Sequence, residues 1–206
     1  MSQLTNNLIL KGYLKTDLVI DAFSEIQRIE FIPEEYHRSS DADVPFPIGY
    51  GRSIPQPQIV STILELLDIH RGDHILEVGS GSGWITALLA YMVGEDGYVV
   101  ATDSSQELLD LARENVDKYQ FIKRERVKLF HKEHKEGYKE AMPYDKILVN
   151  VVMEEVPQEL KDQLRVGGTM IVPLYNDIWT LKKESEDEFS KEIYSGFSFI
   201  PLETKG

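Results

Sequence analysis

The chain has 206 residues, of which 42% are hydrophobic and 28% are charged, and it contains no cysteine. These values are typical of one soluble globular domain, and the lack of cysteine excludes disulfides, thiol catalysis and cysteine metal ligands. The formal net charge of −13 produces a broad acidic field that repels phosphate groups, so we expect no nucleic-acid partner.

The strongest candidate for a basic patch begins at Lys123, Arg124, Arg126 and Lys128, but acidic residues interrupt it, which favours a solvated face. No apolar run approaches the ~18 residues that a membrane span requires. The first twelve residues, MSQLTNNLILKG, lack the basic region and apolar core of a secretory signal. We therefore expect a cytoplasmic protein with no membrane partner.

The first third of the chain has a helical pattern followed by a break. Residues 5–35 carry apolar side chains at roughly helical spacing, with Gly12 as an interruption, which predicts an N-terminal helical extension. Residues 41–57 are rich in proline and glycine and predict a loop. An amphipathic helix follows, and Pro57 suits its first turn.

From residue 74 onward, short apolar strands alternate with helical patterns. The predicted strands are 74–78, 98–102, 127–130, 146–152 and 169–174, and the predicted helices are 84–93, 105–117 and 157–164, with a turn at Gly167-Gly168. Strands separated by helices imply a parallel sheet. The C-terminal segment departs from this alternation of strands and helices. Residues 178–183 and 192–202 are typical of antiparallel strands joined by a polar loop.

The sequence therefore predicts an α/β fold. We expect a Rossmann-like, doubly wound, mostly parallel sheet with an antiparallel C-terminal hairpin and an N-terminal helical extension.

The sharpest motif is HILEVGSGSGWITALLA (74–90), in which a buried strand leads into Gly79, Gly81 and Gly83 and then into a helix. Glycines there permit a tight turn and let the backbone approach a ligand. The spacing is G-x-G-x-G, unlike the G-x-G-x-x-G of dinucleotide-binding proteins. Glu77 would be unfavourable beside a pyrophosphate, and it suits a cationic ligand such as the sulfonium and amino group of S-adenosylmethionine.

An acidic residue, Asp103, follows the second strand, twenty residues after Gly83. An acid at this place can bind both hydroxyls of a ribose, as in dinucleotide-binding folds. The loop and the acid together favour a nucleoside cofactor. The alternatives are a strand–turn–helix with incidental glycines and a nicotinamide dehydrogenase, although the glycine spacing and Glu77 disfavour the second.

With this loop in place, the whole chain resembles the protein-L-isoaspartate O-methyltransferase family. The segments that carry the likeness are FIPEEY (31–36), PFPIGYGRSIPQP (45–57), LEVGSGSGWITALLA (76–90), EGYKEAMPYDKILVN (136–150), VPQELKDQLRVGGTMIVPL (156–174) and FSFIPL (197–202). The resemblance implies a carboxyl methyltransferase that acts on isoaspartyl or D-aspartyl residues of damaged proteins and initiates their repair. Its cofactor would be S-adenosylmethionine, its product S-adenosylhomocysteine and its partner a protein or peptide, and we favour a monomer.

The resemblance also implies which residues form the site. The cofactor would be held by Ser53, Ile54, Glu77, Gly79, Ser80, Gly81, Gly83, Asp103, Ser104 and Glu133. Pro55, Asn150 and Val151 would lie on the substrate side. No metal site is predicted, because His131 and His134 stand among loop charges and are expected to be solvated.

The chain would then be one methyltransferase domain, 1–206. We expect an N-terminal helical region with the substrate-side loop (1–57), a cofactor-binding core (58–175) and C-terminal strands (176–206).

The chain departs from the family pattern near the reacting centre. The family's T-I-S is Ser53-Ile54-Pro55 here, so Pro55 replaces a serine that the family places at the reacting centre. The family's G-A-A or T-A-A after the fourth strand is Asn150-Val151-Val152, and this added bulk would narrow or reshape the substrate pocket.

A second departure lies at the adenine end. The family's D-G after the third strand aligns with Glu133 and His134, so Glu133 keeps an acceptor for the adenine amino group while a glycine is lost.

The loss of the serine leaves the chemistry possible. Methyl transfer to a carboxylate is an in-line displacement, and an aspartyl carboxyl with a pKa near 3.9 is already ionised at pH 7, so no general base is required. We assign no catalytic residue firmly, and Ser53 or Ser61 is a possible replacement hydroxyl. Asn150 is a possible partner for a substrate amide. Two alternatives remain: a methyltransferase for another peptide or small-molecule carboxylate, and a cofactor-binding module without turnover.

Overall fold

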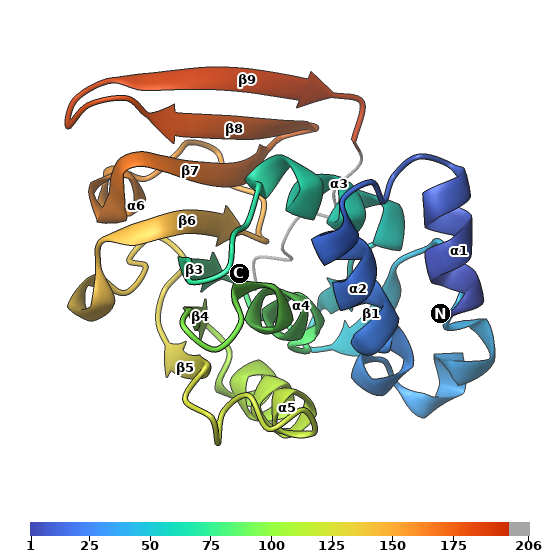
Figure 1. Cartoon of the computed structure of the whole chain (residues 1–206). Coiled ribbons are helices and arrows are strands. Elements are labelled where there is room, and N and C mark those ends of the chain that lie inside the picture. The colour runs from blue at the N-terminus through green and yellow to red at the C-terminus, as the bar shows by residue number, and fades with distance from the viewer. Residues whose placement is uncertain (198–206) are drawn as a thin grey trace.

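The computed structural model describes residues 1–197 and is built around a seven-stranded sheet (Figure 1). Its strands are β3 (His74–Val78), β4 (Tyr98–Asp103), β5 (Val127–His131), β6 (Tyr144–Val149), β7 (Leu164–Leu174), β8 (Asp177–Lys183) and β9 (Phe189–Ser195). The strand order is β5-β4-β3-β6-β7-β8-β9, in which the first five strands are parallel and the last two antiparallel. The predicted fold class is therefore confirmed.

Helices cover both faces of the sheet, with α1 to α5 on one face and α6 on the other. They are α1 (Gln3–Leu10), α2 (Asp17–Glu25), α3 (Pro57–Leu67), α4 (Trp84–Val93), α5 (Gln106–Asp117) and α6 (Gln158–Gln163), with 3-10 turns η1 (Arg28–Phe31), η2 (Glu34–Ser39) and η3 (Lys139–Ala141). Successive strand residues face opposite sides. Ile75 and Val99 pack with the layer of α1 to α5, while Leu76 and Val100 pack with Leu160 of α6.

The N-terminal prediction is confirmed in outline, and the predicted loop is partly wrong. Residues 5–35 form α1 and α2, with the chain interrupted at Gly12, followed by 3-10 turns. Within the predicted loop 41–57, β1 (Phe46–Gly49) and β2 (Arg52–Ile54) form an antiparallel hairpin. Its strands are only three or four residues long, so their alternation was too short to stand out among prolines and glycines.

Three predicted boundaries in the C-terminal half are corrected. β6 ends at Val149 rather than at residue 152. The predicted turn at Gly167-Gly168 lies inside β7, where a register shift against β6 absorbs the extra residues. The last predicted strand, 192–202, is β9 at Phe189–Ser195, and its final residues, 198–202, lie outside the described part of the chain.

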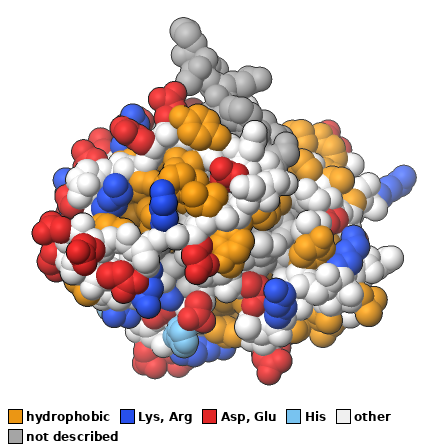
Figure 2. Space-filling model, turned by 90° about the horizontal axis from the view of Figure 1, so that it is seen from above, with side chains coloured by type: hydrophobic (Ala, Val, Ile, Leu, Met, Phe, Trp, Pro, Cys, Tyr) orange, Lys and Arg blue, Asp and Glu red, His pale blue; other side chains and the backbone are white. Residues whose placement is uncertain are grey.

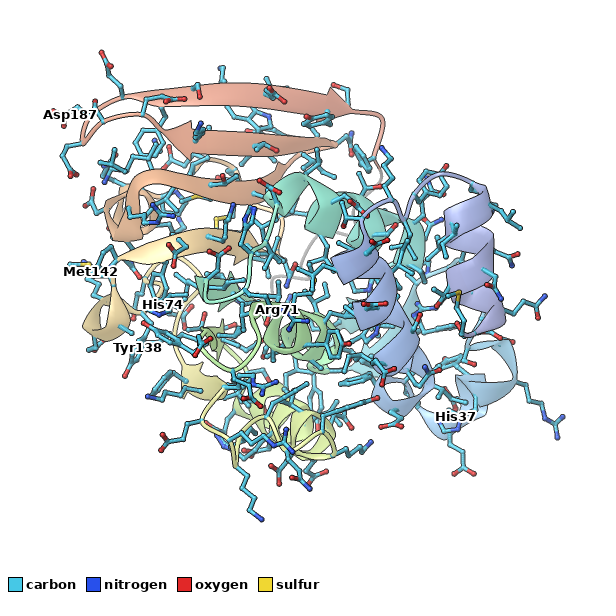
Figure 3. All side chains as sticks on the ribbon, in the orientation of Figure 1. His37, Arg71, His74, Tyr138, Met142 and Asp187 are labelled. Carbon is cyan, nitrogen blue, oxygen red and sulfur yellow. The ribbon has the colours of Figure 1, made fainter. Side chains whose placement is uncertain are left out.

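The surface matches the acidic composition of the chain. Figure 2 shows acidic and basic side chains interspersed on the face seen from above. Side chains fill the space between the sheet and the helices, as Figure 3 shows. No helix within residues 1–197 is long and apolar enough to cross a lipid bilayer.

Candidate functional site

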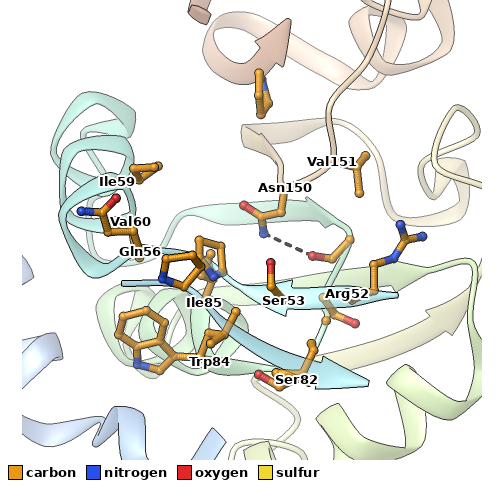
Figure 4. A pocket seen from close by; sticks show the side chains of 18 of the residues that line it. Arg52, Ser53, Gln56, Ile59, Val60, Ser82, Trp84, Ile85, Asn150 and Val151 are labelled. Carbon is orange, nitrogen blue, oxygen red and sulfur yellow. Dashed lines mark hydrogen bonds between the residues drawn. The ribbon is translucent and has the colours of Figure 1, made fainter. Parts of the chain in front are cut away.

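A cavity of about 160 Å³ opens at the carboxyl ends of β3, β4 and β6 (Figure 4). Ligands of open α/β sheets bind at this edge, where neighbouring strands lead into different loops. The predicted site residues that line the cavity are Ser53, Ile54, Pro55, Gly79, Ser80, Gly81, Asp103, Asn150 and Val151. Four others, Glu77, Gly83, Ser104 and Glu133, lie outside its lining.

The glycine loop forms one wall, and its backbone is fixed by β4. The amides of Gly79 and Ser80 both donate to the Thr102 carbonyl, at 2.8 and 3.0 Å. Gly79 has φ +91°, and a β-carbon there would lie 2.9 Å from Val151 Cγ1. The loop therefore needs glycine for both its conformation and its close approach to the end of β6.

Gly83 has a packing role. It precedes α4 with φ +87°, and a β-carbon there would lie 2.9 Å from Val116 Cγ2 of α5. Its small size lets α4 and α5 approach each other. Gly83 therefore supports the packing of these two helices and does not line the cavity.

Asp103 closes the loop and is 2% exposed. Its Oδ2 accepts a hydrogen bond from the Gly81 amide at 3.0 Å, and its Oδ1 accepts one from the Ser105 amide at 3.1 Å. Because each carboxylate oxygen can accept more than one bond, Asp103 retains acceptor capacity toward the cavity. This is the capacity that two ribose hydroxyls require.

Two polar atoms at the cavity are buried and have no hydrogen-bond partner among the described residues. They are Ser80 Oγ and Trp84 Nε1. Both residues line the cavity, and Trp84 also packs edge-on against Phe23. Because buried polar atoms are normally paired, the unpaired Ser80 Oγ on the glycine loop indicates a site built for a ligand with polar groups.

Glu77 is fully buried beneath the loop. Its Oε2 accepts a hydrogen bond from Thr86 Oγ1 at 2.5 Å, and its Oε1 accepts one from Asn150 Nδ2 at 2.7 Å. Burial raises the pKa of Glu77 to about 8, against the opposing effect of the Thr86 bond, and nearby Asp103 raises it further. The carboxyl group contacts protein on both oxygens, so its link to the cavity runs through Asn150.

The facing wall is the segment from Ser40 to Gln56, which we call the hairpin segment. It is held by Arg28, which is 4% exposed. The Arg28 guanidinium donates to the carbonyls of Ala42, Val44 and Pro55, at 2.9, 2.7 and 3.1 Å. A fourth, longer bond of 3.4 Å reaches the Ser40 carbonyl.

Two aromatic rings also pack against the Arg28 guanidinium. The guanidinium carbon lies 4.8 Å from the Phe46 ring centre and 5.3 Å from that of Trp84. Burial lowers the pKa of Arg28 to about 10, partly offset by Asp43, so the side chain stays charged at pH 7. No sequence pattern marks Arg28, because a single arginine in a helical stretch carries no motif.

The hydroxyls near Pro55 separate into one that faces the cavity and one that does not. Ser53 lies in β2 opposite Pro47 and lines the cavity together with Pro55. Ser61 is fully buried, and its Oγ donates to the Gln58 carbonyl at 2.9 Å. The hypothesis that Ser61 replaces the family serine is therefore wrong, and Ser53 remains the candidate.

The loop after β5 lies beside Asp103. His134 is half-buried and its Nε2 lies 3.2 Å from Ser104 Oγ, so the expectation of a solvated His134 is wrong. Burial lowers the pKa of His134, which Asp103 counteracts and Arg52 reinforces. Glu133 is exposed. Arg52 lines the cavity and is a second cation that no sequence motif marks.

The fold and the site define a Rossmann-like α/β protein with a nucleoside-type ligand site at the carboxyl ends of its parallel strands. The site combines a glycine loop, the acid Asp103 and a covering hairpin segment.

The chain belongs to the protein-L-isoaspartate(D-aspartate) O-methyltransferase family, whose profile matches residues 1–206. It is 35% identical to protein-L-isoaspartate O-methyltransferase of Methanopyrus kandleri, covering 97% of this chain and 89% of the relative. It is also 35% identical to the enzyme of that name from Ignicoccus hospitalis, covering 97% and 95%.

A solved structure has the same fold. It is that of a Plasmodium falciparum candidate protein-L-isoaspartate O-methyltransferase in complex with S-adenosyl-L-homocysteine. The TM-score is 0.85 over 97% of this chain and 96% of the neighbour, at 23% identity. Similarity at this identity supports the fold.

The residues present fit S-adenosylmethionine. Ser80 Oγ is an unpaired buried donor and acceptor at the glycine loop, and Asp103 has spare acceptor capacity. The loop backbone can approach a ligand because Gly79 and Gly81 carry no side chain, and Ile54 supplies an apolar wall. These polar groups, the exposed loop backbone and the apolar wall suit a nucleoside that carries both charged and apolar portions.

Proposed function

We propose that this protein is an S-adenosylmethionine-dependent carboxyl methyltransferase that acts on isoaspartyl or D-aspartyl residues of damaged proteins and so initiates their repair. The observation that carries the proposal is that the glycine loop, Asp103 and the hairpin segment meet at one cavity in a chain of this family. The product would be S-adenosylhomocysteine.

The cofactor would be held mainly by the glycine loop and Asp103, with Ser53 and Ile54 covering it from β2. Ser104 and Glu133 would lie toward its adenine end. When bound, S-adenosylmethionine supplies an electrophilic methyl group on a sulfonium.

The chain's own residues then have to orient the acceptor and exclude water. An aspartyl-type carboxyl is ionised at neutral pH, so no residue of the site needs to remove a proton. Pro55, Val151 and Asn150 would form the acceptor side. Arg28 fixes the Pro55 carbonyl and thereby the wall against which the acceptor would lie.

A second candidate function keeps the fold and cofactor and changes the acceptor. Pro55 stands where the family has a serine, and Val151 packs close against Gly79. A narrower, less polar acceptor site would favour a different peptide or a small-molecule carboxylate. A cofactor-binding protein without turnover is the third possibility.

The three functions are separated by one assay with two matched synthetic peptides, identical except that one has an isoaspartyl and the other an aspartyl linkage. With methyl-labelled cofactor, the proposal predicts a base-labile methyl ester on the isoaspartyl peptide alone. Esterification of neither peptide, with label entering a component of a cell extract, would favour another acceptor. Cofactor binding without any transfer would favour the third function.

The proposal also includes a monomeric, cytoplasmic enzyme without nucleic-acid or membrane partners. It treats 1–206 as one domain, with 1–57 on the substrate side, 58–175 as the cofactor core and 176–206 as the C-terminal strands. Light scattering of the purified chain would test the monomer, since a mass near twice 23.6 kDa would contradict it.

A further inference from the structure

The amide of Asn150 has a fixed orientation at the cavity wall. Its Nδ2 donates to Glu77 Oε1 at 2.7 Å and to the Gly79 carbonyl at 3.3 Å. Both partners offer acceptor oxygens on the same side, so the nitrogen of the amide must face them. Figure 4 draws one hydrogen bond from this nitrogen as a dashed line and shows the oxygen turned the other way.

The oxygen of that amide is an acceptor available to a ligand. Asn150 lines the cavity, and no donor within residues 1–197 bonds its Oδ1. In Figure 4 this oxygen lies on the side of the cavity where Ile59 and Val60 of α3 form the wall. A polar acceptor in apolar surroundings selects a ligand group that can donate strongly.

Glu77 strengthens this acceptor while staying out of contact with the ligand. Both of its oxygens are bonded inside the protein, to Thr86 and to Asn150. When an amide donates to a buried acidic group, its own oxygen becomes a better acceptor, because bonds in a chain polarise one another. Asn150 therefore transmits the effect of Glu77 to the cavity.

The position of Asn150 relative to Asp103 indicates which ligand group it meets. Asp103 ends β4 and Asn150 follows β6, with β3 and the glycine loop between them. Strands lie ~4.8 Å apart, so the two residues are separated by roughly 10 Å, two strand spacings. A nucleoside whose ribose is at Asp103 would extend its amino-acid chain over the loop to Asn150.

We propose that Asn150 Oδ1 accepts a hydrogen bond from the α-ammonium group of the cofactor, and that Glu77 is a positioning residue acting through Asn150. This inference rests on the proposed use of S-adenosylmethionine. It replaces the direct contact between Glu77 and the cationic ligand that the sequence suggested, and it moves the Asn150 oxygen from the acceptor side to the cofactor.

The test compares two ligands by calorimetry: S-adenosylhomocysteine, and 5′-methylthioadenosine, which keeps the adenine, ribose and thioether but lacks the amino-acid portion. Asn150→Ala should weaken S-adenosylhomocysteine binding roughly 10- to 100-fold and leave 5′-methylthioadenosine binding within about twofold. Asn7→Ala is the control, because Asn7 is an exposed amide of α1 that does not line the cavity. It should alter neither affinity by more than about twofold.

Two outcomes would overturn the inference. An equal loss for both ligands would show that Asn150 only supports the glycine loop. No loss for either, with a raised KM for the acceptor peptide, would place its oxygen on the acceptor instead. If the wild-type chain binds neither ligand, the proposed function itself fails, which is a distinct result.

A second variant keeps the inference testable if Asn150→Ala does not fold. Glu77→Gln keeps a carbonyl oxygen for Asn150 and an amide that can donate to Thr86 Oγ1, so the local packing is preserved. At pH 8.5, where Glu77 of the wild type is mostly ionised, we expect it to reduce the preference for S-adenosylhomocysteine over 5′-methylthioadenosine severalfold. An unchanged preference would contradict the role of Glu77, and urea unfolding of each variant checks that it is folded.

Discussion

The two walls of the cavity are held in different ways. The glycine loop is part of the sheet, since the Thr102 carbonyl of β4 binds the amides of Gly79 and Ser80. The hairpin segment has little backbone support of this kind and depends on Arg28, which binds carbonyls as far along the chain as Pro55. The glycine-loop wall is thus fixed by backbone hydrogen bonds to the sheet, and the hairpin-segment wall by one distant side chain.

The largest effect is expected from removing that side chain. Arg28→Met would leave buried carbonyls of the hairpin segment unpaired, and we expect a loss of about 3–5 kcal/mol in the free energy of unfolding. Urea denaturation measures it. The matched control is Arg38→Met, because Arg38 is exposed, and it should change stability by less than about 0.5 kcal/mol. Similar stabilities for the two variants would contradict the role of Arg28.

The free energy of unfolding is expected to depend on pH because of Glu77, which lies beneath the glycine loop. The folded chain keeps the Glu77 proton up to a pKa of about 8, whereas the unfolded chain loses it near 4.5. Between these values the folded state binds more protons, so stability falls as pH rises. Thr86, Asn150 and the charge of Asp103 surround this group.

Glu77→Gln removes this titration. Between pH 5.5 and 8, its free energy of unfolding should fall by about 3 kcal/mol less than that of the wild type. Urea denaturation at both pH values gives the difference. Parallel pH profiles of the two proteins would show that Glu77 is ionised throughout, and would refute the raised pKa.

The next effect concerns cofactor affinity. Asp103→Asn should weaken binding of S-adenosylhomocysteine and of 5′-methylthioadenosine alike, by roughly 10- to 100-fold, because both ligands carry the ribose. Calorimetry compares it with Asp110→Asn, an exposed acid of α5 that should have no effect. Unchanged affinity in Asp103→Asn would remove the ribose assignment. The equal loss distinguishes Asp103 from Asn150, whose loss should be selective.

The smallest effect is expected on the acceptor side. Pro55→Ser restores the hydroxyl of the family pattern while leaving the Pro55 carbonyl position available to Arg28. One added hydrogen bond to the acceptor should raise kcat/KM for an isoaspartyl peptide roughly 2- to 10-fold. Pro47→Ser, on the exposed side of β1, should leave it unchanged. A lower kcat/KM in Pro55→Ser would show that the proline suits the true acceptor.

The contrast between the walls also explains what the sequence could predict. The core strands and the glycine loop are encoded by apolar alternation and by residues close in sequence, so their positions were found to within a few residues. The hydrogen bond between Arg28 and Pro55 joins residues 27 apart, and that between Glu77 and Asn150 joins residues 73 apart. No local pattern marks such pairs.

Thr86 shows the same limit within a single helix. It occupies an otherwise apolar helix, α4, where one hydroxyl is easily taken for a tolerated core residue. Its function becomes visible only when the fold places it against Glu77. Buried polar pairs of this kind are determined by tertiary structure, so a local sequence pattern does not predict them.

The proposed cofactor and acceptor sites are tested most directly by a crystal structure of the chain with S-adenosylhomocysteine and an isoaspartyl peptide. We expect the ribose hydroxyls at Asp103, the ammonium group at Asn150 Oδ1, and the isoaspartyl carboxylate between Pro55 and Val151. A nucleoside bound away from Asp103 would contradict the cofactor site. A peptide seated instead in the separate groove between Phe31 and Lys118 would contradict the acceptor site.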